Sequence, residues 1–144
     1  MDGTDDRTFE AWNAFVMESQ YEAYPSGDEK RAAAIAKAYM NGANGGGINS
    51  FLTNSYELDA QEVLLALQEV GAMEAAHELA HILTQIGKPI RASSQEARWN
   101  LLTSAWSNEL DEQDCLSFSA DAELLKVLEA HVAKYQAFYC GLAC

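Results

Sequence analysis

The residues best suited to carry chemistry are His77, Glu78 and His81, which stand in the pattern H-E-x-x-H. Two histidines four positions apart share one face of a helix and can bind a single zinc ion. The glutamate beside the first histidine can then act as a general base, as it does in zinc hydrolases. One hypothesis is therefore a zinc-dependent hydrolase centred on these three residues.

The surrounding sequence disfavours that hypothesis. Thr84 and Gly87 occupy the positions where an extended zinc motif has glycine and histidine, and the third histidine, His131, lies 50 residues beyond the motif. The apolar spacing of the segment puts His77 and His81 on its polar side, where no site that excludes water is expected. We therefore expect no catalytic residue, no cofactor and no metal site. Adventitious or interface metal at the two histidines is a minor alternative.

The elements that must position these side chains are helical. The chain has 144 residues, 49% of them hydrophobic, only two prolines, and no segment that alternates apolar and polar residues as a strand does. Apolar residues recur at helical spacing, which predicts an all-α fold, a compact bundle of about six to eight helices in one domain over residues 1–144. The helices are expected over residues 5–24, 28–40, 58–70, 72–86, 93–106 and 119–139.

Several helix starts carry recognisable signals. Asp5 or Asp6 can cap the first helix, and Ser93 followed by Glu96 has the form of a capping box. Residues 108–114, which are polar and acidic, are expected to form a link between the last two helices. These signals set the expected boundaries of the elements.

A glycine run, Gly45 to Gly47, precedes the apolar residues Ile48 and Phe51. Glycine adopts positive φ without penalty and lets backbones approach closely, so the run predicts a sharp, packed corner between helices. The turn pair Asn54-Ser55 and a helix that ends at a C′ glycine are expected to follow. The residues of this structural motif are Gly46, Gly47, Phe51, Asn54, Ser55 and Gly71.

Charge is the most unusual property of the composition. The chain has 22 acidic and 9 basic residues, for a net charge of −13. Such a surface repels nucleic acid and anionic membranes and attracts basic proteins. Acids are concentrated in residues 1–29, 57–78 and 109–129, and two basic islands lie between these stretches. The islands consist of Lys30, Arg31, Lys37, Lys88, Arg91 and Arg98.

The acidic stretches could imitate the phosphates of DNA. Carboxylates three or four positions apart on a helix lie about 5–6 Å apart at Cβ, within the range of spacings that a duplex offers. The alternative interpretation is a set of solvated helix faces and helix caps. The acids expected to contact a basic partner are Asp59, Glu62, Glu69, Glu74, Glu109, Asp111, Glu112 and Asp114.

The sequence also bears on the compartment. No window approaches the length of apolar residues that a membrane span needs, and the N-terminus has no basic and apolar regions of a signal peptide. The three cysteines do not form a paired framework, which favours a reducing cytoplasm. Cys140 and Cys144 stand four positions apart without a nearby histidine, so metal binding there is not expected.

The glycine corner and the helix after it resemble the DNA-mimic protein family and its relatives of unknown function. The likeness covers about residues 30–138 and is densest over residues 45–72. One difference is Ile48, where that family usually has an aromatic residue. The residues that carry the resemblance are Gly46-Gly47, Phe51, Asn54-Ser55, Ala66-Leu67, Val70-Gly71-Ala72, Leu110-Asp111 and Phe118. The resemblance implies a helical domain, and none of the matching residues has a catalytic or binding role.

Composition and resemblance together favour a non-enzymatic protein that binds a basic partner. The most concrete form is a DNA mimic that occupies the DNA-binding surface of a transcription regulator and does not bind nucleic acid or membrane itself. An inhibitor or immunity-type protein for a basic toxin or enzyme is an alternative, and the zinc hydrolase is another. A homodimer is expected, with Trp12, Trp99 and Trp106 as core or interface anchors.

Overall fold

The computed structural model describes residues 3–142, with side chains from Arg7 onward, and no strand occurs among them. Eight of the nine α-helices in this part of the chain have at least seven residues, which confirms the all-α bundle. In chain order the elements are α1 (Gly3–Glu18), the 3-10 turn η1 (Tyr21–Ala23), α2 (Glu29–Gly46), α3 (Ile48–Asn54), α4 (Ala60–Val70), α5 (Met73–Ile86), α6 (Gln95–Ala105), α7 (Asn108–Glu112), α8 (Phe118–Lys134) and α9 (Gln136–Leu142). Within residues 3–142, none of these helices combines the length and apolar character that a membrane crossing requires.

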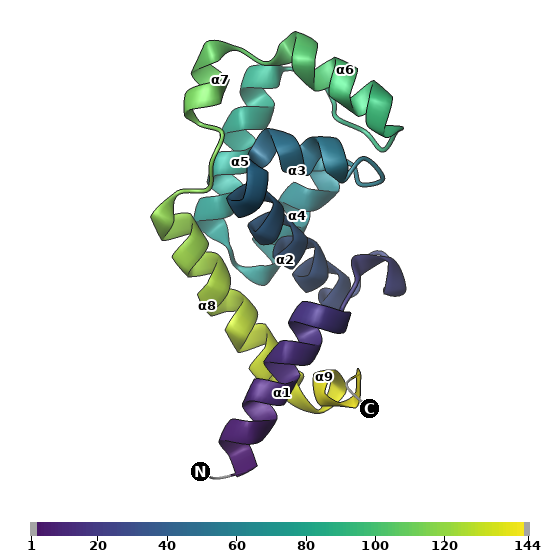
Figure 1. The fold of residues 1–144 in the computed structure, drawn as a ribbon, viewed down its shortest axis with the longest axis vertical. Coiled ribbons are helices and arrows are strands. Elements are labelled where there is room, and N and C mark those ends of the chain that lie inside the picture. The colour runs from purple at the N-terminus through teal and green to yellow at the C-terminus, as the bar shows by residue number, and fades with distance from the viewer. Residues whose placement is uncertain (1–2, 143–144) are drawn as a thin grey trace.

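Helix α2 forms the centre of the bundle and packs against α3, α4 and α8 (Figure 1). Ala33 and Ala36 have no exposed surface, and Ile35 is 1% exposed. Small side chains on this helix let its neighbours approach closely from several sides. Helices α3, α4 and α8 are therefore held around a central, alanine-rich helix.

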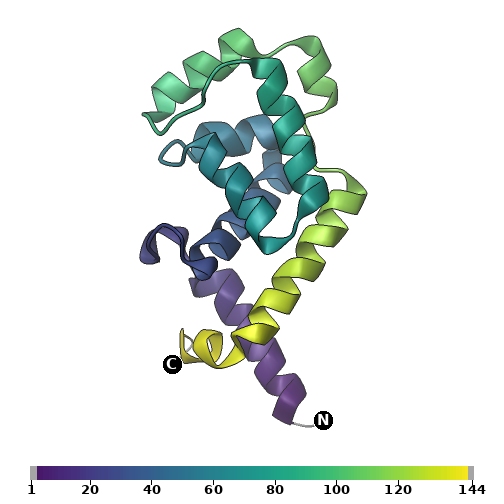
Figure 2. The same ribbon diagram turned by 180° about the vertical axis from the view of Figure 1, so that it is seen from behind.

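The two ends of the molecule are built from different parts of the chain. Helices α6 and α7 lie at one end, and α1 and α9 lie together at the other (Figures 1 and 2). Phe15 of α1 packs edge-on against Tyr139 of α9, with ring centroids 5.2 Å apart. Helix α8 runs along the side of the bundle and connects the two ends.

The predicted corner lies between α2 and α3. Helix α2 continues through Gly46, so only Gly47, with φ +93°, forms the corner itself. No helix was predicted for residues 48–54, which form α3. Phe51 of α3 is buried edge-on against Tyr39, with ring centroids 5.1 Å apart. Gly71 adopts the left-handed conformation and closes α4, as predicted.

The first helix differs from the sequence-based expectation at both ends. It begins at Gly3, so Asp5 and Asp6 stand inside its first turn, and it ends at Glu18. The side chain of Lys37 on α2 donates to the carbonyl oxygens of Phe15 and Ser19, at 2.9 and 2.5 Å. The carbonyl of Phe15 also accepts from the backbone N–H of Ser19, and Lys37 adds a donor where a helix end leaves carbonyls short of partners. A residue of another helix therefore helps to fix where α1 stops.

Three later boundaries also differ. Ser94 caps α6 by accepting from the N–H of Ala97 at 3.1 Å, so the expected capping box at Ser93 is wrong by one residue. The expected link over residues 108–114 contains the short helix α7. The last helix breaks at Tyr135, which separates α8 from α9.

Candidate functional site

The H-E-x-x-H residues lie on the outer side of α5. His77 and His81 are exposed, and His81 Nε2 lies 3.0 Å from Nε2 of Gln85. Glu78 is half-buried and accepts a hydrogen bond from the N–H of Ser117 at 3.3 Å. The glutamate therefore connects α5 to the start of α8.

Among the described side chains, no third ligand completes a metal centre at this motif. Across residues 7–142, no group of three or more histidine, cysteine, aspartate and glutamate side chains has an arrangement that could hold a metal ion. His131 is buried elsewhere, with its Nε2 2.6 Å from the hydroxyl of Tyr139. The other pair of possible metal ligands in the sequence is Cys140 and Cys144, and Cys144 lies outside the described residues.

An open groove of about 390 Å³ lies beside this motif, between α5, α7 and the loop that leads into α8. Neither lysine nor arginine is among the described residues that line it. Its polar lining includes His77, Glu78, His81, Glu112, Gln113 and Ser117. The groove thus presents two carboxylates and two histidines, with no lysine or arginine among the described residues of its lining.

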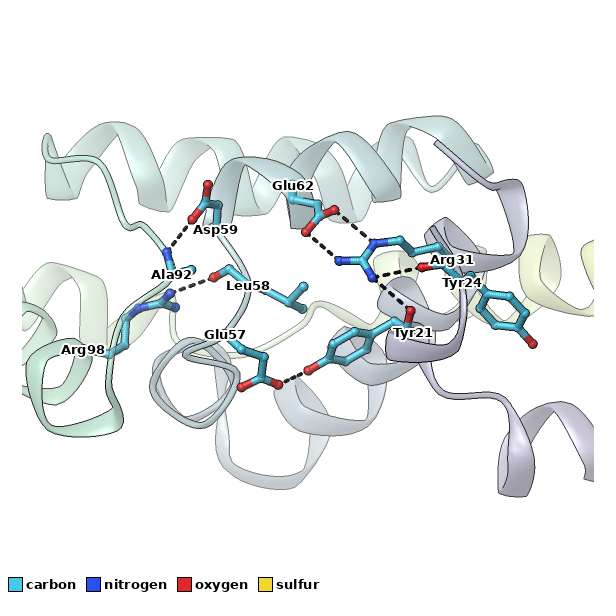
Figure 3. A network of polar contacts seen from close by, with 9 residues as sticks. All are labelled: Tyr21, Tyr24, Arg31, Glu57, Leu58, Asp59, Glu62, Ala92 and Arg98. Carbon is cyan, nitrogen blue, oxygen red and sulfur yellow. Dashed lines mark hydrogen bonds and ion pairs between the residues drawn. The ribbon is translucent and has the colours of Figure 1, made fainter. Parts of the chain in front are cut away.

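Four of the eight acids expected to bind a partner have structural contacts inside the protein. Glu62 accepts two hydrogen bonds of 3.1 Å from Arg31, and Asp59 accepts from the N–H of Ala92 (Figure 3). Asp111 accepts from Nε1 of Trp106 at 2.6 Å. These carboxylates hold neighbouring segments together, which the spacing of acids in the sequence could not reveal.

Asp114 is the fourth of these acids and braces the glycine corner. Its Oδ1 accepts from the N–H of Asn49 at 2.7 Å, at the start of α3. Burial raises the pKa of this carboxyl, and the charge of Asp111 raises it further, while the backbone donors of Asn49 and Ile48 lower it. Asp114 is only half-exposed, so its part in an outer binding surface is limited.

The other four expected acids are exposed, and no described residue donates to their side chains. Glu69 lies in the last turn of α4, Glu74 lies in the first turn of α5, and Glu109 and Glu112 lie on α7. The backbone N–H of Glu74 donates to Glu123 of α8 at 2.9 Å, which brings two carboxylates close together. These four acids remain available to a partner.

The basic islands predicted from the sequence lie only partly at the surface, because Lys88 and Arg91 are exposed but the other members are buried or paired. Lys37 is 7% exposed and Arg98 is 1% exposed. Arg98 donates to the carbonyl oxygens of Leu52, Leu58 and Arg91, each at 2.7 Å, and to that of Tyr56 at 3.1 Å (Figure 3 shows the bond to Leu58). Three further cations are in ion pairs, namely Lys30, Arg31 and Lys134.

The acids therefore lie in two different surroundings. Near α2 and α4 they share surface hollows with cations, because Glu62 and Glu69 line a hollow with Arg31. Asp59 lines a larger groove of about 580 Å³ together with Lys88 and Arg91. Among the described residues, the α5–α7–α8 side combines a groove lined by two carboxylates with a lining that contains neither lysine nor arginine. That side is the stronger candidate for binding a cationic partner.

The exposure of Phe118 was not expected from the sequence. Phe118 begins α8, directly after Ser117 at the edge of the groove, and is 91% exposed. Leu125, seven positions later on the same side of α8, is 41% exposed. Phe118, Ala122 and Leu125 stand at i, i+4 and i+7 and form an apolar stripe on α8. Recognising this stripe from the sequence would have required the position at which α8 starts.

Fold and site together define an acidic, all-helical protein that presents carboxylates around an open groove. Residues 22–138 match the family described as DMP19-like protein. The match covers well over half of the 144 residues, so the chain belongs to the DMP19-like family. No curated protein and no solved structure gives a significant match.

Proposed function

We propose that this protein is not an enzyme but a binding module that engages a basic protein through its acidic surface. In its most concrete form it is a DNA mimic that occupies the DNA-binding surface of a transcription regulator. The observation that carries the proposal is the separation of charges. Two of the nine bases are buried and three are in ion pairs, whereas exposed acids such as Glu109 and Glu112 accept no bond from the described residues.

The spacing of the free carboxylates supports mimicry. Glu109 and Glu112 are three positions apart on α7, so their Cβ atoms lie about 5–6 Å apart on one helix face. Phosphates along a DNA strand are separated by comparable distances. A regulator that binds DNA with lysine and arginine side chains can therefore engage these carboxylates by the same electrostatic attraction.

We also propose a homodimer in the cytoplasm that has no contact with nucleic acid or membranes. Exposed apolar side chains on α1 and α6 support the dimer, because Phe9 is 67% and Trp99 57% exposed. Trp12 and Trp106 are half-buried, so Trp99 is the tryptophan that fits an interface anchor. Sedimentation equilibrium of the wild type and Trp99→Ala would test this, with a monomeric wild type contradicting it.

The partner experiment uses the purified protein as bait in native cytosol at low salt. Retained proteins are eluted with a salt gradient, identified and purified. Duplex DNA is then added to the isolated complex. The proposal predicts elution at moderate salt, because screening weakens exposed charge pairs, and displacement by DNA. An inhibitor of a basic toxin or enzyme would show the same salt dependence, but DNA would not displace its partner.

The zinc hydrolase remains the alternative from another class. The structure gives its motif two exposed histidines and a glutamate bonded to Ser117. We expect protein purified without added metal to contain far less than one zinc per chain, by elemental analysis. Stoichiometric zinc that disappears in a His77→Ala/His81→Ala variant would contradict the binding-module proposal.

A further inference from the structure

The groove beside α5 has features that a general acidic surface does not require. Glu78 and Glu112 line it, and Gln113 adds a buried amide oxygen that accepts no hydrogen bond from the described residues. The buried hydroxyl of Tyr39 has a raised pKa because of burial and of the charges of Glu78 and Asp114. The groove therefore offers carboxylate and amide acceptors beside His77 and His81, and its described lining contains neither lysine nor arginine.

An exposed aromatic residue follows directly, along the chain, a residue that lines this groove. Phe118 directly follows Ser117, a lining residue, and 91% of its surface is exposed. With Ala122 and Leu125 it forms a stripe at i, i+4 and i+7 along α8, which is the spacing that packs against another helix. Aromatic side chains are enriched among the residues that dominate binding at protein interfaces. Mimicry of DNA by charge alone would have no use for this stripe.

We propose that the groove and Phe118 together dock an arginine-bearing helical segment of the basic partner. An arginine side chain enters the groove between Glu78 and Glu112, and an apolar residue of the same helix covers Phe118 and Leu125. The inference rests on the proposed function, since it names where and how the acidic surface engages its partner.

Arginine fits this groove better than lysine does. Its guanidinium presents five donors in a planar fork and forms paired hydrogen bonds with carboxylates. The same plane can stack on an aromatic ring such as that of Phe118. Lysine offers a more strongly hydrated point charge, so we expect it to bind the same surface with lower affinity.

The test uses a blocked helical peptide of about 18 residues, long enough to form a helix in contact with the protein. Its arginines stand at i and i+4 beside one apolar stripe, and matched peptides carry lysine or glutamine in place of arginine. Binding is followed by NMR of the isotope-labelled protein at low salt. We expect shifted amide signals to concentrate in residues 77–82 and 112–118, with the affinity order arginine, lysine, glutamine.

Matched variants separate the groove from the general charge. Glu112→Gln and Phe118→Ala should each weaken binding of the arginine peptide by about fivefold or more. Glu96→Gln removes an equal charge from α6, and Met17→Ala removes an exposed apolar side chain from α1 at the other end of the molecule (Figure 1). These two controls should bind within about twofold of the wild type. All four positions are exposed, so melting temperatures should be unchanged.

Two results would overturn the inference, and they have different consequences. If the shifts spread over carboxylates such as Glu69 and all four variants bind alike, the groove is not the docking site, but the acidic surface still binds basic segments. If the arginine peptide binds nowhere on the protein at low salt, both this inference and the proposed function fail.

Discussion

Two cationic side chains, Lys37 and Arg98, lie in the interior and donate to backbone carbonyl oxygens. Lys37 bonds to three carbonyls at the end of α1, and Arg98 bonds to carbonyls before α4 and before α6. Burial lowers the pKa of both side chains. Their hydrogen bonds offset part of the cost of removing a charge from water. An acidic protein thus uses scarce cations as internal connectors, which leaves its surface more negative.

Replacing Arg98 with alanine should be strongly destabilising. The change removes a donor from four carbonyl oxygens, of which that of Tyr56 keeps the N–H of Ser93, and the bonds to Leu52 and Leu58 are buried. We expect a loss of at least about 3 kcal/mol in the free energy of unfolding, measured by urea denaturation. Arg91→Ala is the matched control, because its side chain is exposed, and should change stability by no more than about 0.5 kcal/mol. Equal effects of the two changes would contradict the structural role of Arg98.

His131 should make stability depend on pH. Burial lowers its pKa in the folded protein, although the carboxylate of Glu29 opposes the shift. The unfolded chain therefore binds a proton at a higher pH than the folded protein does. The contribution of His131 to the free energy of unfolding is complete above the pKa of about 6.5 that the histidine has in the unfolded chain. This contribution is lost as the pH falls toward the lower pKa that the histidine has in the folded protein.

The comparison uses His131→Gln, which keeps a hydrogen-bonding group near Tyr139 but does not titrate. From pH 7.5 down to about 5, the wild type should lose more free energy of unfolding than the variant does. Carboxylates titrate in both proteins, so their contribution cancels in the difference. Parallel stability curves over this range would show that His131 is not the group responsible.

At the scale of elements, the periodicity of apolar residues was sufficient to predict most helices. Residues 58–70 and 72–86 became α4 and α5 with boundaries close to those expected, since each has a clear stripe and a glycine after it. The misplaced boundaries depend on partners distant in sequence. Helix α1 stops where Lys37 reaches its last carbonyls, and α3 depends on Asp114 at its first turn. Local signals contain no information about such contacts.

The glycine run allows a matched test of the corner. Gly47 has φ +93° and ψ 169°, a conformation nearly exclusive to glycine, and an added Cβ would lie 2.8 Å from the carbonyl oxygen of Asp114. Gly47→Ala should destabilise the protein by at least about 2 kcal/mol. Gly45 lies in α2 with nothing within 4 Å of an added Cβ. Gly45→Ala should therefore stabilise by about 0.5–1 kcal/mol.

Thermal and urea unfolding of the two variants would measure the change in the free energy of unfolding for each substitution. That the two changes have opposite signs matters more than their magnitudes, because a flexible linker would tolerate alanine equally at both positions. Destabilisation by both changes would mean that Gly45 is also packed. Tolerance at both would mean that the corner does not hold the backbone of Gly47 as described.

At the scale of the whole molecule, the sequence predicted the excess of acids but not which of them face a partner. Half of the eight expected carboxylates bond to other parts of the chain, and Arg98 and Lys37 are buried. The groove beside α5 joins residues from three elements, with Glu78 and Ser117 separated by 38 intervening residues. Its composition, and the exposure of Phe118 beside it, emerge only from the folded arrangement.

The most direct measurement of the central claim is competition between this protein and duplex DNA for the purified partner. The affinity of the complex is measured by fluorescence anisotropy with labelled DNA, at several salt concentrations. The account predicts mutually exclusive binding, with affinities for DNA and for the protein that both fall steeply as salt rises. A ternary complex of partner, DNA and this protein, or binding indifferent to salt, would contradict it.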